Sequence, residues 1–156
     1  MDYAREEFNL LLGERTAEDI KISIGSAAPL SERLEAVMRG RDMITGLPKA
    51  IVVNDDHIRT ALARSVTSIV DAVRQTIEEA PPELVADFME KGITLAGGGA
   101  LLRNLDKVLE EAVRIPVHIA SDPLTCVVRG TGLVLEDLDA LRPVLVSSRY
   151  DTTPFK

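Results

Sequence analysis

Cysteine, histidine and long apolar runs are scarce in this 156-residue sequence. Cys126 is the single cysteine, and His57 and His118 are the only histidines. The sequence therefore offers neither an internal disulfide nor a zinc site of the cysteine–histidine type. We interpret Cys126 as a small buried side chain rather than a nucleophile, and a reducing, cytosolic compartment as its natural setting. No run approaches the roughly 20 apolar residues of a membrane span, although peripheral membrane contact stays open.

Positive charge and aromatic side chains are scarce as well. Eighteen basic residues against 25 acidic ones give 18 − 25 = −7, and aromatic residues make up 3%, with no tryptophan. A nucleic-acid surface that works by phosphate neutralisation or base stacking is therefore excluded. In contrast, 46% of the residues are hydrophobic. That is enough to bury a core, in one domain or in two small lobes that share it.

The first 24 residues predict two helices. The apolar side chains of the first helix share one side; they are Phe8, Leu11 and Leu12. Gly13 would end this helix. Thr16 is a good N-cap for the second helix. Glu18 and Lys21 lie three residues apart on one face of that helix. Their spacing alone indicates a solvated ion pair worth roughly 0.3 kcal/mol.

Between residues 31 and 53 the apolar period becomes that of strands. RLEAVMRGRD places Leu34, Ala36 and Met38 against polar neighbours, and LPKAIVVN is a compact apolar run. The turn-rich MITG separates these two segments. We expect a small antiparallel unit flanked by helices.

Asn54 is the predicted cap of the longest helix. Asp55 and Asp56 occupy its first turn, where the helix dipole favours acidic residues. Apolar residues then recur at three- and four-residue steps. They are Ile58, Leu62, Val66, Ile69, Val73 and Ile77. Pro81 and Pro82 end this helix, and Pro82 can open a short helix over ELVADFMEK.

From Gly92 onward the predicted order is strand, helix, strand, helix. The strands are GITLA, 92–96, and IPVHIA, 115–120, and the helix between them covers 101–111. Its expected inward side chains are Leu101, Leu105, and Val108 or Leu109. Asp122 caps the last predicted helix, Pro123 takes its first position, and the small residues 130–132 allow close packing on a sheet. A strand–helix–strand crossover of this length indicates parallel pairing, so the predicted fold class is α/β.

A run of three glycines, 97–99, joins the first of these strands to the helix after it. In open α/β sheets ligands bind beyond the carboxyl ends of the strands, and the N–H groups of a glycine turn suit phosphate or ribose. The motif itself is weak, because G-x-x-x-x-G-K-[ST] is absent and Leu102 stands where G-x-G-x-x-G has its third glycine. From the residues alone, a tight turn without a ligand is an equal alternative. No triad or carboxylate pair marks a catalytic site.

Three long stretches nevertheless resemble, in order, the carboxyl-terminal half of the MreB family, the bacterial actin-like proteins. They are NLLLGERTAEDIKISIGSAAPL, RGRDMITGLPKAIVV and PPELVADFMEKGITLAGGGALLRNLDKVLEEAVRIPVHIASDPLTCVVRGTG, within about Asn9 to Leu141. Ala28 and Ala96 depart from the family's pattern, in which Tyr and Thr are common at these positions. The resemblance implies part of an actin/Hsp70-type ATPase fold, namely its second lobe with a small inserted α+β subdomain.

The resemblance also implies a nucleotide site. Glu18 and Lys21 of the T-A-E-x-x-K segment would lie at the nucleoside, and GGGALL would line one wall of an ATP cleft near the ribose and phosphates. The residues of that wall that carry over are Gly98, Gly99, Ala100 and Leu101. Mg would be held mainly by a first lobe that this sequence lacks, and no metal ligand is expected within it. Full-length members are slow ATPases, and this chain alone is expected to be inactive.

For the whole protein the resemblance implies filaments formed by self-association in the cytoplasm, at the inner face of the plasma membrane. These filaments would direct cell-wall synthesis and rod shape together with membrane-bound cell-shape and cell-wall synthesis proteins, without nucleic acid. Membrane association would be peripheral, through parts absent here. Two alternatives stay open. One is a stand-alone protein-interaction module without nucleotide binding; the other is a sugar-kinase-like enzyme on the same superfamily fold, for which no sugar site is visible.

The expected domain organisation follows from the same resemblance. Residues 1–13 would be the entry helix of the larger subdomain, and 14–75 the small inserted subdomain. Residues 76–141 would end the larger subdomain with the glycine-rich loop, and 142–156 would form a surface tail. Because the entry helix lacks the strands it would pack against, we expect an exposed apolar face on it.

Overall fold

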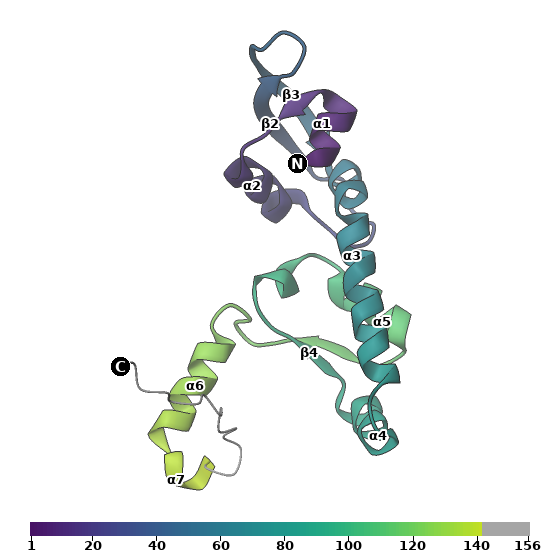
Figure 1. Cartoon of the computed structure of the whole chain (residues 1–156), viewed down its shortest axis with the longest axis vertical. Helices are drawn as coiled ribbons and strands as arrows, with labels where there is room; N and C mark the ends of the chain where they lie inside the picture. Colours follow the sequence, from purple (N-terminus) through teal and green to yellow (C-terminus); the bar gives the residue numbers. More distant parts are fainter. Residues whose placement is uncertain (142–156) are drawn as a thin grey trace, which may run out of the picture.

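The computed structural model describes residues 1–141, which form two hydrophobic cores along one long helix (Figure 1). In chain order the elements are α1 (Asp2–Phe8), β1 (Leu10–Leu11), α2 (Glu14–Ile24), β2 (Glu35–Asp42), β3 (Pro48–Asn54), α3 (Asp55–Glu78), α4 (Pro82–Lys91), β4 (Ile93–Leu95), the 3₁₀ turn η1 (Gly98–Leu101), α5 (Leu105–Val113), β5 (Val117–Ile119), α6 (Cys126–Glu136) and α7 (Leu138–Leu141). The expected tail, 142–156, lies outside the described residues.

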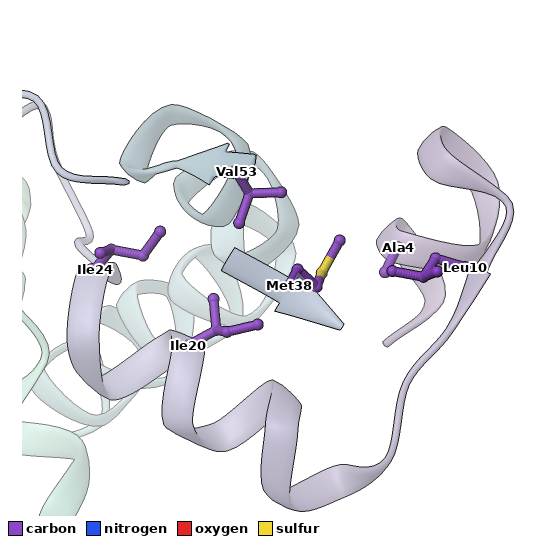
Figure 2. Close-up of a cluster of buried hydrophobic side chains, with 6 residues drawn as sticks. All are labelled: Ala4, Leu10, Ile20, Ile24, Met38 and Val53. Carbon is purple, nitrogen blue, oxygen red and sulfur yellow. The ribbon is translucent and has the colours of Figure 1, made fainter. Parts of the chain in front are cut away.

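The first core lies between a three-stranded antiparallel sheet, in the order β1-β2-β3, and the helices α1 and α2. β2 pairs with β3 from Glu35 opposite Asn54 to Arg41 opposite Pro48, so the predicted antiparallel unit is confirmed. Figure 2 shows the buried side chains of this core pointing into one space. They are Ala4, Leu10, Ile20, Ile24, Met38 and Val53.

The first helix is shorter than the sequence predicted. It ends at Phe8 because Asn9 takes the left-handed conformation, with φ 50° and ψ 40°. Leu10 and Leu11 then pair with the end of β2 as the short strand β1. Leu10 is completely buried in this strand. The expected exposed apolar face is also wrong for α1, because Ala4 is buried and Phe8 packs against the first core.

α2 begins two residues before the predicted Thr16 cap. Gly13 is its N-cap, in an extended conformation, and Glu14 occupies the first turn. Glycine is tolerated at this position, and an acidic residue in the first turn complements the helix dipole. The helix buries Ile20 and Ile24, four residues apart on one face.

α3 is capped as predicted and spans both cores. The Asn54 side chain accepts a hydrogen bond from the His57 N–H, and His57 Nδ1 accepts one from the Asn54 N–H. The helix has 24 residues and is therefore about 36 Å long. Ile58 packs against the first core, whereas Leu62 packs against the second. The buried residues of the second core are Val66, Val70, Leu105, Leu109 and Val117.

The predicted parallel crossover is confirmed, with different helix boundaries. β4 pairs with β5 in parallel, from Ile93 opposite Val117 to Leu95 opposite Ile119. α5 begins at Leu105 instead of Leu101, because residues 98–101 wind into the tighter turn η1 and Asn104 is left-handed, with φ 60°. Leu101, expected to point inward, is 54% exposed as a result.

α6 also begins later than predicted and packs little. The Asp122 carbonyl accepts hydrogen bonds from the N–H groups of Thr125, at 3.1 Å, and Cys126, at 3.0 Å, but residues 123–125 form a turn and α6 starts at Cys126. None of the described residues of α6 is buried, and Cys126 is a free, half-buried thiol. A Cβ at Gly130 or Gly132 would meet nothing within 4 Å. The predicted close packing of residues 130–132 on a sheet is therefore not made by the described part of the chain.

Candidate functional site

The glycine turn, residues 97–101, follows the carboxyl end of β4 and is fixed at both of its ends. Gly97 has φ 83°, a conformation that glycine adopts without strain, and its N–H donates to the Pro123 carbonyl at 2.7 Å. The Leu102 N–H donates to the Gly99 carbonyl at 3.1 Å, which closes the 3₁₀ turn. Ala100 points inward and is buried, so it anchors the turn while Leu101 stays exposed.

The outer side of this turn is open. A Cβ at Gly99 would have no heavy atom within 4 Å, and one at Gly98 would only touch the Leu124 side chain at 3.4 Å. Neither residue has a positive φ. The backbone and packing of the chain therefore do not themselves require glycine at 98 or 99. The space is free for a group that approaches the turn closely.

Glu18 and Lys21 are both exposed on α2. Among the ion pairs of residues 1–141 none joins these two side chains, so the solvated ion pair predicted from spacing does not form. Both contribute to the lining of a cavity of about 280 Å³ beside the first core. The residues of the glycine turn are not part of that lining.

The segments that follow the two motifs are hydrogen-bonded to each other. Ser26 forms a parallel bridge with Arg103, and the Ala27 N–H donates to the Arg103 carbonyl at 2.8 Å. A Cβ on Gly25 would lie 3.4 Å from the Leu102 side chain. We call this contact between residues 22–29 and 102–104 the junction. It attaches α2, which carries Glu18 and Lys21, to the residues directly after the glycine turn.

Side chains strengthen the junction. The Arg103 guanidinium donates from one nitrogen to the carbonyls of Ile22, at 3.1 Å, and Gly25, at 3.2 Å. The Asn104 amide donates to the Pro29 carbonyl at 3.2 Å. Sequence reasoning missed Arg103, because 78 to 81 residues separate it from its partners and nothing in the local pattern marks the contact.

Neither a metal cluster nor a spanning helix is found within residues 1–141. No three or more histidine, cysteine, aspartate or glutamate side chains gather there as they would to hold a metal ion. No helix of this part combines the length and the apolar character needed to cross a membrane. The candidate site thus consists of an open turn, two exposed charged side chains and the junction between them.

Comparison with known protein sequences gives consistent matches over most of the chain. The model of the family described as MreB/Mbl protein matches residues 1–143. The cell shape-determining protein Mbl of Bacillus subtilis is 46% identical over 141 residues, which cover 90% of this chain and 42% of that protein. The cell shape-determining protein MreB of Escherichia coli K12 is 49% identical over 139 residues, covering 89% and 40%. The chain therefore spans about two fifths of the length of these relatives.

Solved structures agree with the sequence matches. MreB5 of Spiroplasma citri bound to ADP superposes with a TM-score of 0.84 and 40% identity, covering 88% of this chain and 42% of that one. The same protein bound to AMPPNP gives a TM-score of 0.85 and 39% identity, covering 92% and 44%.

Proposed function

The chain belongs to the MreB/Mbl family of cell shape-determining proteins and has its α/β actin-like fold, and from this premise we propose that it forms one wall of an adenine-nucleotide site. The observation that carries the proposal is the open outer side of the glycine turn, at the carboxyl end of β4. Support comes from the relatives of known structure, which were solved with ADP and AMPPNP.

Each motif has its own part in the proposed site. The backbone of Gly98, Gly99 and Ala100 would face the ribose and phosphates. The space that a Cβ at position 99 would occupy is free of protein atoms, so the ligand can lie there. Leu101 would offer an exposed apolar surface beside them. On α2, the Glu18 carboxylate would accept hydrogen bonds from hydroxyl groups of the nucleoside, and the Lys21 ammonium would donate to its acceptors. Among the ion pairs of residues 1–141 none joins the Glu18 carboxylate to the Lys21 ammonium, so both groups can bind the ligand.

We propose that the nucleotide is ATP and that Mg²⁺ arrives with it. Residues 1–141 hold no cluster of metal ligands, so the ion would depend on phosphate oxygens and on groups beyond this part of the chain. Phosphoryl transfer depends on charge placed around the phosphates, and one wall of a cleft does not supply it. The chain by itself is therefore expected to bind ATP without hydrolysing it. Steady phosphate release that survives removal of contaminating enzymes would contradict this.

For the whole protein we propose self-association into filaments at the inner face of the plasma membrane. Such filaments would direct cell-wall synthesis and rod shape together with membrane-bound cell-shape and cell-wall synthesis proteins. Support comes from the family, whose members are described as cell shape-determining. The subdomain boundaries after residues 13, 75 and 141 also remain a proposal. Along α3 the change from the first core to the second falls between Ile58 and Leu62, before the proposed boundary at residue 75.

The test of the nucleotide site is the Gly99→Ala variant, titrated with Mg-ATP by calorimetry. The added methyl meets no protein atom, so the free energy of unfolding should stay unchanged or rise by about 0.4–1 kcal/mol. ATP affinity should nevertheless fall about tenfold or more, because the methyl enters the ligand's space. Gly130→Ala, also in open space but on α6, is the matched control and should leave binding unchanged.

Two results would reject the proposal. Equal ATP affinity in the Gly99→Ala variant and the parent chain would remove the glycine turn from the site. A parent chain that binds no ATP, yet binds a full-length filament protein, would favour the interaction module instead.

A further inference from the structure

The junction connects the two cores in addition to α3, and four hydrogen bonds cross it. They are Ala27 N–H to the Arg103 carbonyl, Arg103 to the Ile22 carbonyl, Arg103 to the Gly25 carbonyl, and Asn104 to the Pro29 carbonyl. We propose that Arg103 is a positioning residue, which holds α2 at a fixed distance from the glycine turn. This spacing would set the width of the proposed nucleotide site, so the affinity part of the inference rests on the proposed function.

Arg103 is suited to this task because its charge meets the carboxyl end of α2. The last carbonyl groups of a helix have no partner within it and carry partial negative charge. Gly25, the C-cap residue, donates its N–H to the Lys21 carbonyl, whereas the Ile22 carbonyl accepts from Arg103. Among the ion pairs of residues 1–141 none includes Arg103. Its guanidinium therefore acts on α2 rather than on a neighbouring carboxylate.

The Arg103 contact lies close to both parts of the proposed site, the charged side chains of α2 and the glycine turn. Glu18 lies four residues before Ile22, or about 6 Å along the same rigid helix. On the other side, Arg103 follows Leu101 by two residues and lies in the segment that leaves η1. A displacement at the junction would therefore move Glu18 and Lys21 relative to the glycine turn almost directly. α3, which joins the cores over about 36 Å, can bend gently and fixes this spacing less tightly.

A simple helix cap would make the same hydrogen bonds, so the test must measure position as well as stability. Arg103→Met removes the guanidinium and keeps an unbranched apolar side chain, and Arg103→Lys restores a charged donor. Arg74→Met is the matched control. The Arg74 guanidinium also donates to a distant backbone carbonyl, that of Ala112 at 3.3 Å, but it joins α3 to α5 on the side of the second core.

Spin labels on exposed residues of α2 and α5 report the spacing directly. The labels replace Arg15 and Glu110 after substitution to cysteine, in a Cys126→Ser background that leaves no other thiol. Electron–electron double resonance should give one narrow distance distribution for the parent chain and for Arg74→Met. We expect a broadened or shifted distribution for Arg103→Met and an intermediate one for Arg103→Lys.

Calorimetric titration with Mg-ATP supplies the second readout. Arg103→Met should weaken ATP binding about tenfold, the order of effect of losing one charged hydrogen bond, and Arg74→Met should not. An unchanged distance distribution in Arg103→Met overturns the positioning role. A changed distribution with unchanged ATP affinity overturns its effect on the nucleotide site. If the parent chain binds no ATP, the proposed function fails, and the distance measurement still decides whether Arg103 fixes α2.

Discussion

At the scale of single residues, Asp42 is the carboxylate most strongly held by its surroundings. It is nearly buried, and its Oδ2 lies 2.8 Å from Lys49 Nζ. Its Oδ1 accepts hydrogen bonds from the N–H groups of Ile44, at 2.8 Å, and Thr45, at 2.9 Å. The Lys49 hydrogen bond first, and the two backbone N–H groups after it, hold the pKa of Asp42 well below its usual range. Its role is to close the β2–β3 hairpin, away from the candidate site.

We predict that Asp42→Asn destabilises the chain at neutral pH and that the loss disappears in acid. The folded-state pKa lies below the unfolded value of about 3.9, so the carboxylate stabilises the fold above about pH 4. This contribution is lost as the pH falls through the folded-state pKa. Urea unfolding at pH 7 and pH 3 should show a smaller difference between variant and parent at pH 3. The control Asp19→Asn, at an exposed position, should unfold at the same urea concentration as the parent. An equal stability difference for Asp42→Asn at both pH values would contradict the role given to the Asp42 carboxylate.

At the scale of elements, the local apolar pattern was sufficient to predict a helix or strand where the patterned residues are also buried. The β2–β3 hairpin, the cap of α3 and the parallel pairing of β4 with β5 were predicted correctly, because most of the residues that set their period face a core. Ile69 of the predicted α3 stripe is instead 43% exposed. The errors fall where one residue leaves the regular conformation. Asn9 and Asn104 both have positive φ, and each displaces a helix boundary that apolar spacing had placed elsewhere. β1 is a further case, because only pairing with β2 makes it a strand.

The cap of α3 yields the prediction at this scale. Asn54→Ala removes the acceptor for the His57 N–H and should lower the free energy of unfolding by about 1 kcal/mol. Asn54→Ser keeps an oxygen acceptor and should retain most of that stability. Because α3 packs against both cores, the loss should appear in one cooperative transition of the described fold. Equal stability of the alanine and serine variants, measured by urea unfolding, would show that the side-chain cap contributes nothing.

At the scale of the whole molecule, the motifs indicated the family and the fold, and both are confirmed. The candidate site was predictable only in part. TAEDIK and GGGALL carry recognisable residues, so Glu18, Lys21 and the glycine turn could be named from the sequence, and their role in binding stays a prediction. The junction could not be predicted, because Arg103 meets Ile22 and Gly25 through contacts that exist only once the two cores are folded.

The exposed apolar surface of α6 leads to a prediction about association. Val128 and Leu135 are 67% and 65% exposed, and in Figure 1 α6 and α7 extend away from both cores. Apolar side chains gathered on a surface favour contact with another molecule, so the chain should self-associate as its concentration rises. Val128→Gln with Leu135→Gln should reduce this association in sedimentation velocity, without adding charge.

The free energy of unfolding should change by less than about 0.5 kcal/mol in this double variant, because both side chains are solvent-exposed. Ile44→Gln, at the exposed tip of the β2–β3 hairpin, is the control for a general loss of surface hydrophobicity. If that control lowers association equally, α6 is not the contact surface. If the double variant is strongly destabilised instead, α6 packs on the rest of the chain in solution and its apolar side chains belong to the core.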